Sequence, residues 1–243
     1  MKEKNNLLAP LSILAGAIVL SVIIFSLVWK SAKSADQTIT VTGSAKRQIV
    51  SDFGIQRVTL QATAPDRKTA YQTLVQQLPI ALKYLEKKSF TKDQIEVFGI
   101  NGYPVYQVAA NGVVTQNVSH YVYSQRIDIS SPDVKKIKEL SLSMSSLVEQ
   151  GLNINVEQPE YLYTKIDDLK IEIQAEAARN AMDRAAKIAA STGRTLGPLR
   201  SARMGVIQIT PRNSNTVSDY GINDMTSIEK DVTAVVSASF KID

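Results

Sequence analysis

Residues 175–197 read AEAARNAMDRAAKIAASTGRTLG, an alanine-rich run that ends with two glycines four residues apart. Asp167 and Asp168 precede it, where negative charge stabilises the start of a helix. Charged side chains follow at three- and four-residue spacing, and Gly193 can adopt the left-handed conformation that ends many helices. The other side of the run is small or apolar, which allows close packing: Ala178, Ala181, Ala185, Ile188 and Ala189. This segment therefore predicts a structural helix rather than a catalytic element.

Outward from this helix, the apolar residues alternate between the period of strands and the period of helices. One further helix is expected from Pro65-Asp66 to residue 88, with Pro79 kinking or splitting it, and another from Ser131-Pro132-Asp133 to Gly151. Strands are expected at 37–43, 52–63, 94–100, 103–116 (with an Asn-Gly turn), 118–129, 154–164 (or two strands interrupted at Pro159), 196–210 and 232–242. This order predicts an α+β fold of mixed and antiparallel sheets with helices packed on one side, over residues 36–243.

The N-terminus contains a long uncharged segment, LLAPLSILAGAIVLSVIIFSLVW, at residues 7–29. As a helix with a rise of about 1.5 Å per residue it would be roughly 34 Å long, enough to span a bilayer core. Signal peptides have shorter apolar regions and a small-residue cleavage site, which Ala32-Lys33-Ser34 matches poorly. Trp29 and Lys30 are typical of an interfacial anchor. We therefore predict a single uncleaved transmembrane helix within residues 1–35.

The orientation of this helix follows less directly from charge. Lys2 and Lys4 favour an N-terminus inside the cell, whereas Lys30 and Lys33 favour the reverse. Large domains are translocated largely regardless of such charges. We therefore expect residues 36–243 to lie outside the cytoplasm, which for the bacterial family described below would mean an inner-membrane protein with this part in the periplasm.

The composition excludes several classes of function. The chain has no cysteine, which rules out disulfides, zinc ribbons, iron–sulfur sites and thiol catalysis. Its net charge of +5 is concentrated in residues 1–35, and no cluster of Lys or Arg alternates with aromatic residues. Nucleic acid is therefore not an expected partner.

Few residues suggest catalysis or metal binding. His120 is the only histidine, so a serine triad or histidine metal site would depend on it, and its place in a strand favours a half-exposed structural role. No G-x-S-x-G motif is present. Asp219, Asn223 and Asp224 carry oxygen ligands, but their spacing matches no calcium loop and favours a solvated turn. We expect no cofactor, no metal and no enzymatic activity.

Tyrosines are the stronger candidates for an interface. Tyr121 and Tyr123 are spaced to share one face of a strand, as are Tyr161 and Tyr163, and Tyr103 and Tyr106 precede them. Half-buried strand packing explains such residues, and so does an aromatic surface for a subunit or ligand, because tyrosine is enriched at interfaces. The polar loop 211–227, with Asp219 and Tyr220, is longer than a hairpin needs and is a second candidate contact.

Several segments resemble the SIMPL-domain family, which includes the bacterial periplasmic immunogenic proteins. ITVTGSA at 39–45 resembles its opening strand and glycine turn, and YPVY at 103–106 its Pro-x-Tyr segment. Other matches are TAYQTL at 69–74, the alanine-rich helix with its Gly-x-x-x-Gly ending at 175–197, and VTAVVSASF at 232–240. PEYLYTKIDDLKIEIQAEAARNA and SDYGINDMTSIEK resemble a membrane-anchored subgroup. Ala45 and Ser51-Asp52 depart from the commoner pattern, which has a second glycine and Pro-Asp, so the first turn is expected to differ.

This resemblance implies an exported cell-envelope protein, with some members forming ring-shaped oligomers and having links to oxidative or envelope stress. It supplies no catalytic residues. The leading hypothesis is a non-catalytic, membrane-anchored protein that acts by homo-oligomeric assembly or by contacts with other envelope proteins. Two alternatives remain open: a receptor domain for a small ligand or glycan, and an unrecognised hydrolase based on acidic residues.

Overall fold

The computed structural model describes residues 8–35 and 37–242, with side chains described for 11–29 and 37–242. Helix α1, Leu8–Ala35, contains an apolar span from Leu11 to Trp29 with a mean hydropathy of 2.7. The predicted orientation of this helix depends on Lys2, Lys4, Lys30 and Lys33. Lys2 and Lys4 lie outside the described residues, as do the side chains of Lys30 and Lys33. Leu7, the first residue of the predicted span, lies outside them too. The chain divides into two compact units. The first unit comprises Met1–Lys46, Leu169–Ile207 and Thr233–Asp243, and the second Arg47–Asp168 and Gln208–Val232.

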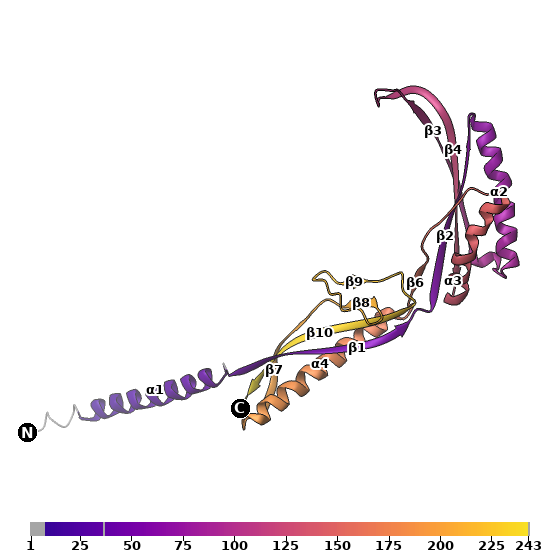
Figure 1. Ribbon diagram of the computed structural model, residues 1–243. Coiled ribbons are helices and arrows are strands. Elements are labelled where there is room, and N and C mark those ends of the chain that lie inside the picture. The colour runs from indigo at the N-terminus through magenta and orange to yellow at the C-terminus, as the bar shows by residue number, and fades with distance from the viewer. Residues whose placement is uncertain (1–7, 36, 243) are drawn as a thin grey trace, which may run out of the picture. The chain divides into compact units, whose positions relative to one another are not determined.

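The first unit packs one helix against an antiparallel sheet (Figure 1). Its strands are the early part of β1 (Thr38–Val50), β7 (Leu196–Met204) and the later part of β10 (Glu229–Ile242), and β10 lies between the other two. Helix α4, Ile166–Ser191, buries a row of residues at four-residue spacing: Leu169, Ile173, Ala177, Ala181, Ala185 and Ala189. The predicted alanine-rich helix is confirmed, but its buried face is rotated, because Ala178 and Ile188 are exposed.

Gly43 explains why this helix needs small residues. A Cβ built at Gly43 would lie 2.3 Å from both the carbonyl oxygen of Ala177 and the amide nitrogen of Ala181. The strand backbone therefore rests directly on the helix backbone. We expected a glycine turn here, and that expectation is wrong: β1 continues through Gly43 to Val50. The glycine is needed for close approach rather than for a turn.

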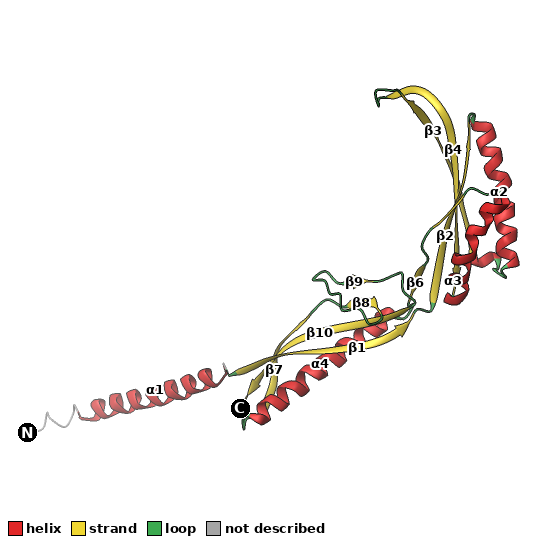
Figure 2. Cartoon of the chain, viewed as in Figure 1, coloured by secondary structure: helices red, strands yellow, loops and turns green. Residues whose placement is uncertain are grey.

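The second unit holds the larger core. Its sheet has the order β3-β4-β2-β5, with β6 also paired to β2, and all these pairings are antiparallel. The strands are β2 (Phe53–Ala64), β3 (Ile95–Val108), β4 (Val114–Ser131), β5 (Ile154–Val156) and β6 (Glu160–Leu162). Helices α2 (Arg67–Lys87) and α3 (Val134–Ser143) cover one face, as predicted (Figure 2). Short 3-10 turns follow at Lys92–Gln94 and Met144–Gln150.

The core of this unit comes from the inward residues of the strands and the buried faces of the helices. Val58 and Leu60 of β2, Ile127 and Ile129 of β4, and Leu74 of α2 are completely buried. Helices α2 and α3 begin at the capping residues that the sequence indicated. Asp66 accepts a hydrogen bond from the Thr69 amide, and Asp133 accepts hydrogen bonds from the Lys135 and Lys136 amides. Pro79 lies within α2, which remains one helix, so the alternative of a split is wrong.

Two small strands complete the second unit. β8 (Gln208–Pro211) is hydrogen-bonded to β10 and pairs in parallel with β9 (Ile222–Asn223). The sequence predicted a polar loop where β9 lies. Residues 154–164 form two strands, which selects the second of our two alternatives.

Candidate functional site

The hairpin formed by β3 and β4 is the first candidate site. Strand β2 pairs with β4 only from Tyr121 to Ser131, so β4 residues 114–120 have β3 as their one partner among the described strands. β3 is the end strand of the described sheet. The part of the hairpin from Pro104 to His120 is therefore two-stranded with two open edges, and it curves away from α2 (Figure 1). An isolated two-stranded hairpin is marginally stable, and its open edges are templates for further pairing.

The register of the hairpin divides its aromatic and aliphatic residues into two sets. Tyr103 pairs with Val122 and Val105 with His120, whereas Tyr106 pairs with Val118 and Val108 with Val114. Directly paired residues of an antiparallel ladder point to the same side of the sheet, and consecutive residues such as Val105 and Tyr106 point to opposite sides. We call the set nearer the tip the hairpin face: Tyr106, Val108, Val114 and Val118. Both valines nearest the tip, Val108 and Val114, are 64% exposed.

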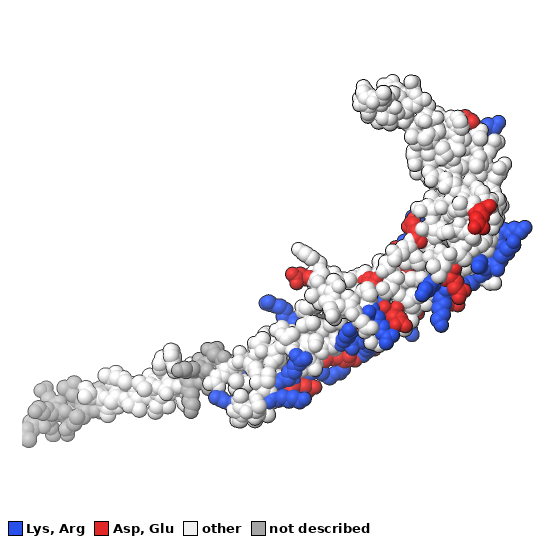
Figure 3. Space-filling model, viewed as in Figure 1, with Lys and Arg blue, Asp and Glu red and all other residues white. Residues whose placement is uncertain are grey.

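The hairpin is also uncharged. From Val97 to Gln125 the chain contains no Lys, Arg, Asp or Glu. Figure 3 shows the consequence as a white end of the second unit. His120 is half-buried in the hairpin, and its Nδ1 lies 3.2 Å from the Ser119 hydroxyl. Exposed apolar surface without charge is typical of contact surfaces.

The root of the hairpin is held firmly against helix α2. Tyr123 packs edge-to-face on Tyr71 of α2, and the Arg67 guanidinium lies 5.0 Å from the centre of the Tyr121 ring. Gly102 leaves room for the Tyr123 ring, since a Cβ there would lie 2.4 Å from it. Tyr121 and Tyr123 therefore pack against the helix, whereas Tyr103 points to the opposite face. Tyr103 and Tyr106 are both exposed.

A bulge and a charge ladder mark where the uncharged part begins. The register of β3 and β4 shifts between Val97 and Ile100, and the Gln125 side chain donates to the Phe98 carbonyl that the bulge frees. Arg126 lies over the Phe98 ring and pairs with Asp128. Arg57 joins Asp128 to Glu160, and the hydrogen bond that Arg57 donates to Glu160 raises the pKa of Arg57 despite its partial burial.

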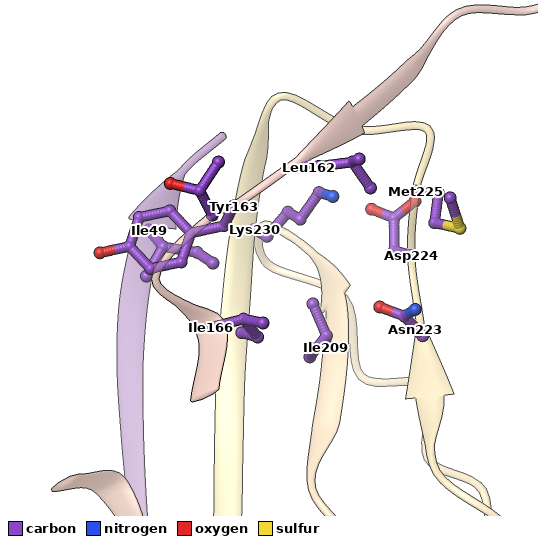
Figure 4. Close-up of a pocket in the computed structure, with 10 residues that line it drawn as sticks. Ile49, Leu162, Tyr163, Ile166, Ile209, Asn223, Asp224, Met225 and Lys230 are labelled. Atoms are coloured by element: carbon purple, nitrogen blue, oxygen red, sulfur yellow. The ribbon is translucent and has the colours of Figure 1, made fainter. Parts of the chain in front are cut away.

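A pocket in the second unit is the other candidate site. It has a volume of about 270 Å³ and lies among the ends of β1, β6, β8, β9 and β10 (Figure 4). Its walls combine apolar side chains with polar ones: Ile49, Leu162, Tyr163, Thr164, Ile166, Ile209, Asn223, Asp224, Met225 and Lys230. Lys230 is 3% exposed, and its Nζ donates to the Tyr161 carbonyl at 2.6 Å.

The charges in this pocket have altered pKa values. Burial lowers the pKa of Lys230, and the negative charge of Asp224 opposes this effect only in part. Burial would raise the pKa of Asp224, but hydrogen bonds from Ser227 and Thr226 and the charge of Lys230 hold it below its ordinary value. Asp224 is therefore ionised at neutral pH before any reaction, and the carboxylate is in the form that accepts a proton.

With this geometry established, the chain was compared with known proteins. The family model SIMPL, described as a protein of unknown function (DUF541), matches residues 39–240. The chain belongs to the SIMPL family. Among curated proteins, none matches the chain. Family membership confirms the resemblance drawn from the alanine-rich helix, the Pro-x-Tyr segment and the last strand.

The SIMPL fold distributes the candidate residues over three places. Tyr103, Tyr106, Tyr121 and Tyr123 all belong to the hairpin, on its two faces. Tyr161 is 4% exposed and packs in the core, so its ring is not available to a partner, while Tyr163 lines the pocket. These two tyrosines therefore do not form a shared exposed face.

Asp219 and Tyr220 lie in the loop 211–227, where Tyr220 is 98% exposed. This loop is tied down at several points. Gln208 donates to the Ser218 carbonyl, the Asn213 amide donates to Asp231, and Arg212 pairs with Glu229. Asp224 accepts from Thr226 and Ser227 through Oδ1, a local turn rather than a cation cage. Among the described residues, no group of three or more His, Asp or Glu is placed to hold a metal ion.

Two features of this SIMPL chain escaped the sequence analysis, although the sequence contains their signals. The first is the stretch from Val97 to Gln125, in which the sequence contains no charged residue. Lys230 continues the buried alternation of β10, since it lies two residues before Val232 and four before Ala234. A lysine on the inward side of a strand is a signal for a buried amine.

Proposed function

We propose that this SIMPL protein is a non-catalytic, membrane-anchored component of the bacterial cell envelope that assembles with copies of itself through the β3–β4 hairpin. Residues 7–29 would anchor each copy in the inner membrane, with residues 36–243 in the periplasm. The observation that supports the proposal best is the hairpin itself, which combines an exposed apolar face, two open edges and no charge. The α1 span supports the anchor, because its apolar side chains are exposed along the whole of 11–29 and lipid would cover them.

A second copy of the same chain is the occupant that the hairpin fits best. Partner selection between different proteins commonly uses complementary charge, and the hairpin has none to offer. An uncharged surface meets an identical surface without like-charge repulsion. The anchors would confine all copies to one membrane and so raise their local concentration.

The two open edges suggest how assembly would proceed. The free edge of β3 in one copy can pair with the free edge of β4 in the next, which is a head-to-tail contact. Contacts of this kind close into rings when the rotation between copies permits. This mode agrees with the ring-shaped oligomers that the resemblance implied, and contacts to other envelope proteins would use the same surface.

Introducing charge into the hairpin face tests the proposal. The variant Tyr106→Glu/Val114→Asp places carboxylates on two exposed positions of the hairpin. Association of copies through the hairpin would have to remove water from these carboxylates, which is costly. We expect full-length wild type in detergent to have the mass of several copies by native mass spectrometry or light scattering, and the variant to shift toward the monomer.

The matched control is Leu142→Glu, which adds a charge at an apolar residue of α3 that is 76% exposed. It should retain the wild-type mass. A monomeric wild type, or equal loss of mass in both variants, would contradict assembly through the hairpin. Circular dichroism of each variant shows whether the fold is kept.

A further inference from the structure

The pocket around Lys230 has the features of a site for a covalent ligand. The lysine enters from β10, where its neighbours on the same side of the strand, Val232 and Ala234, are core residues. Its amine is fixed at one point by the Tyr161 carbonyl, at a distance of 2.6 Å. Figure 4 shows the side chain extending toward Asp224 between Leu162 and the strands below it. No positively charged residue other than Lys230 lines the pocket, as far as the described residues extend.

Asp224 supplies the second polar group. Its Oδ1 is occupied by Thr226 and Ser227, whereas its Oδ2 is buried and has no hydrogen-bond partner among the described residues. A buried carboxylate oxygen without a donor is costly, so a group with a proton to share is expected beside it. Asp224 also interacts electrostatically with Lys230.

The remaining walls define the size and character of the ligand. Ile49, Ile166, Ile209 and Met225 form an apolar chamber. At about 30 Å³ for a water-sized group, the volume of the pocket corresponds to about nine non-hydrogen atoms. A chain of several carbons with one small polar head therefore fits, and a polymer or a nucleotide does not.

We propose that Lys230 captures a short apolar aldehyde in this pocket as a reversible imine. The nitrogen lone pair of the neutral amine attacks the carbonyl carbon, forming the C–N bond while the C=O π electrons move to oxygen. A proton passes from nitrogen to that oxygen and gives a carbinolamine. The proton that the ammonium gave up before the attack is then added to the hydroxyl, and the C–O bond breaks to release water. Written from the ammonium, lysine and aldehyde give a protonated imine and one water, with charge conserved and with no oxidant or reductant.

Each neighbour has a defined part in this reaction. Burial favours the neutral amine, which is the nucleophilic form, and desolvated lysines in apolar pockets are nucleophiles of this kind. The Tyr161 carbonyl accepts one N–H in both the amine and the protonated imine. Oδ2 of Asp224 accepts the proton that the Lys230 ammonium gives up and returns it to the departing hydroxyl, and the charge of the carboxylate then offsets that of the product.

Reductive trapping tests the proposal directly. Full-length protein in detergent is exposed to hexanal with cyanoborohydride, which converts an imine to a stable secondary amine, and the modified lysines are mapped by peptide mass spectrometry. Lys136 is an internal comparator, because its Nζ also donates to a carbonyl, that of Ser89, at 2.6 Å but from an exposed position. We expect Lys230 to be labelled severalfold faster than Lys136.

Two variants and a second aldehyde connect the labelling to the pocket. Lys230→Arg keeps the cation but forms no imine, so labelling should be lost at position 230 and unchanged at Lys136. Met225→Trp fills the chamber and should slow labelling of Lys230 alone. Glyceraldehyde, which is polar, should lose the preference for Lys230. Equal labelling of Lys230 and Lys136 by hexanal, or no labelling of Lys230, would overturn the proposal whatever the variants do. This site is independent of the hairpin, so the result does not bear on the proposed assembly.

Discussion

At the scale of single residues, Lys230 occupies a position in β10 that the strand otherwise gives to apolar side chains. Its burial was predictable in principle from the alternation of Val232, Ala234 and Val236. Residue 230 continues this alternation and so lies on the same, buried side of the strand. Its partners were not predictable, since Tyr161 and Asp224 come from distant segments that only the fold brings together. Local pattern determines which side a residue faces, whereas the chemistry around it depends on tertiary contacts.

The lowered pKa of Lys230 gives a pH dependence of stability with a definite sign. Between this lowered value and the ordinary lysine value, the unfolded chain binds a proton that the folded chain does not, so the free energy of unfolding rises with pH. We expect the difference in unfolding free energy between wild type and Lys230→Met to shift in favour of wild type as pH increases toward about 10. Urea unfolding of both proteins in detergent over this range measures it. A difference that moves in favour of Lys230→Met as pH increases would mean that burial does not lower the pKa of Lys230.

At the scale of elements, the contact between β1 and α4 depends on Gly43. Because its Cβ position lies 2.3 Å from two backbone atoms of α4, Gly43→Ala must push the strand from the helix. Overpacking of this kind typically costs about 1–3 kcal/mol, which denaturant unfolding of the full-length protein resolves. Gly99→Ala is the matched control, since a Cβ there has nothing within 4 Å. It should change stability by less than about 0.5 kcal/mol, and equal effects of the two variants would contradict the close-packing role.

Elements with strong local signals were predicted well, and those with long-range causes were not. The caps at Asp66 and Asp133 and the alternation of the last strand identified their elements correctly. The buried face of α4 was misplaced because its alanines resemble one another on both sides, and only Gly43 selects Ala177 and Ala181. β9 was missed because two residues of parallel pairing leave no pattern in the sequence. The tyrosine pairs were found, but the register that places Tyr103 and Tyr121 on opposite faces depends on bulges in β3.

At the scale of the whole molecule, the account joins a membrane span to a SIMPL domain with an exposed, uncharged hairpin. The apolar helix α1 and the family membership followed from the sequence, through the apolar run at 7–29 and the segments that resemble the family. The division into two units did not, because each unit is assembled from separated segments of chain. Anchoring and self-assembly are connected physically, since copies held in one membrane need only modest affinity to associate.

The measurement that tests this account most directly is cross-linking of the hairpin in membranes of intact spheroplasts. The chain has no cysteine, so the hairpin variant is a mixture of two co-expressed copies with one thiol each, Tyr106→Cys on β3 in one and Val118→Cys on β4 in the other. Leu142→Cys provides an exposed control. A membrane-impermeant bis-maleimide with a flexible linker reaches only thiols outside the cytoplasm. The account predicts covalent oligomers of the hairpin variant that remain with the membranes after a carbonate wash, and monomers for Leu142→Cys. Monomers alone for the hairpin variant, or oligomers that form only after the cells are lysed, would contradict it.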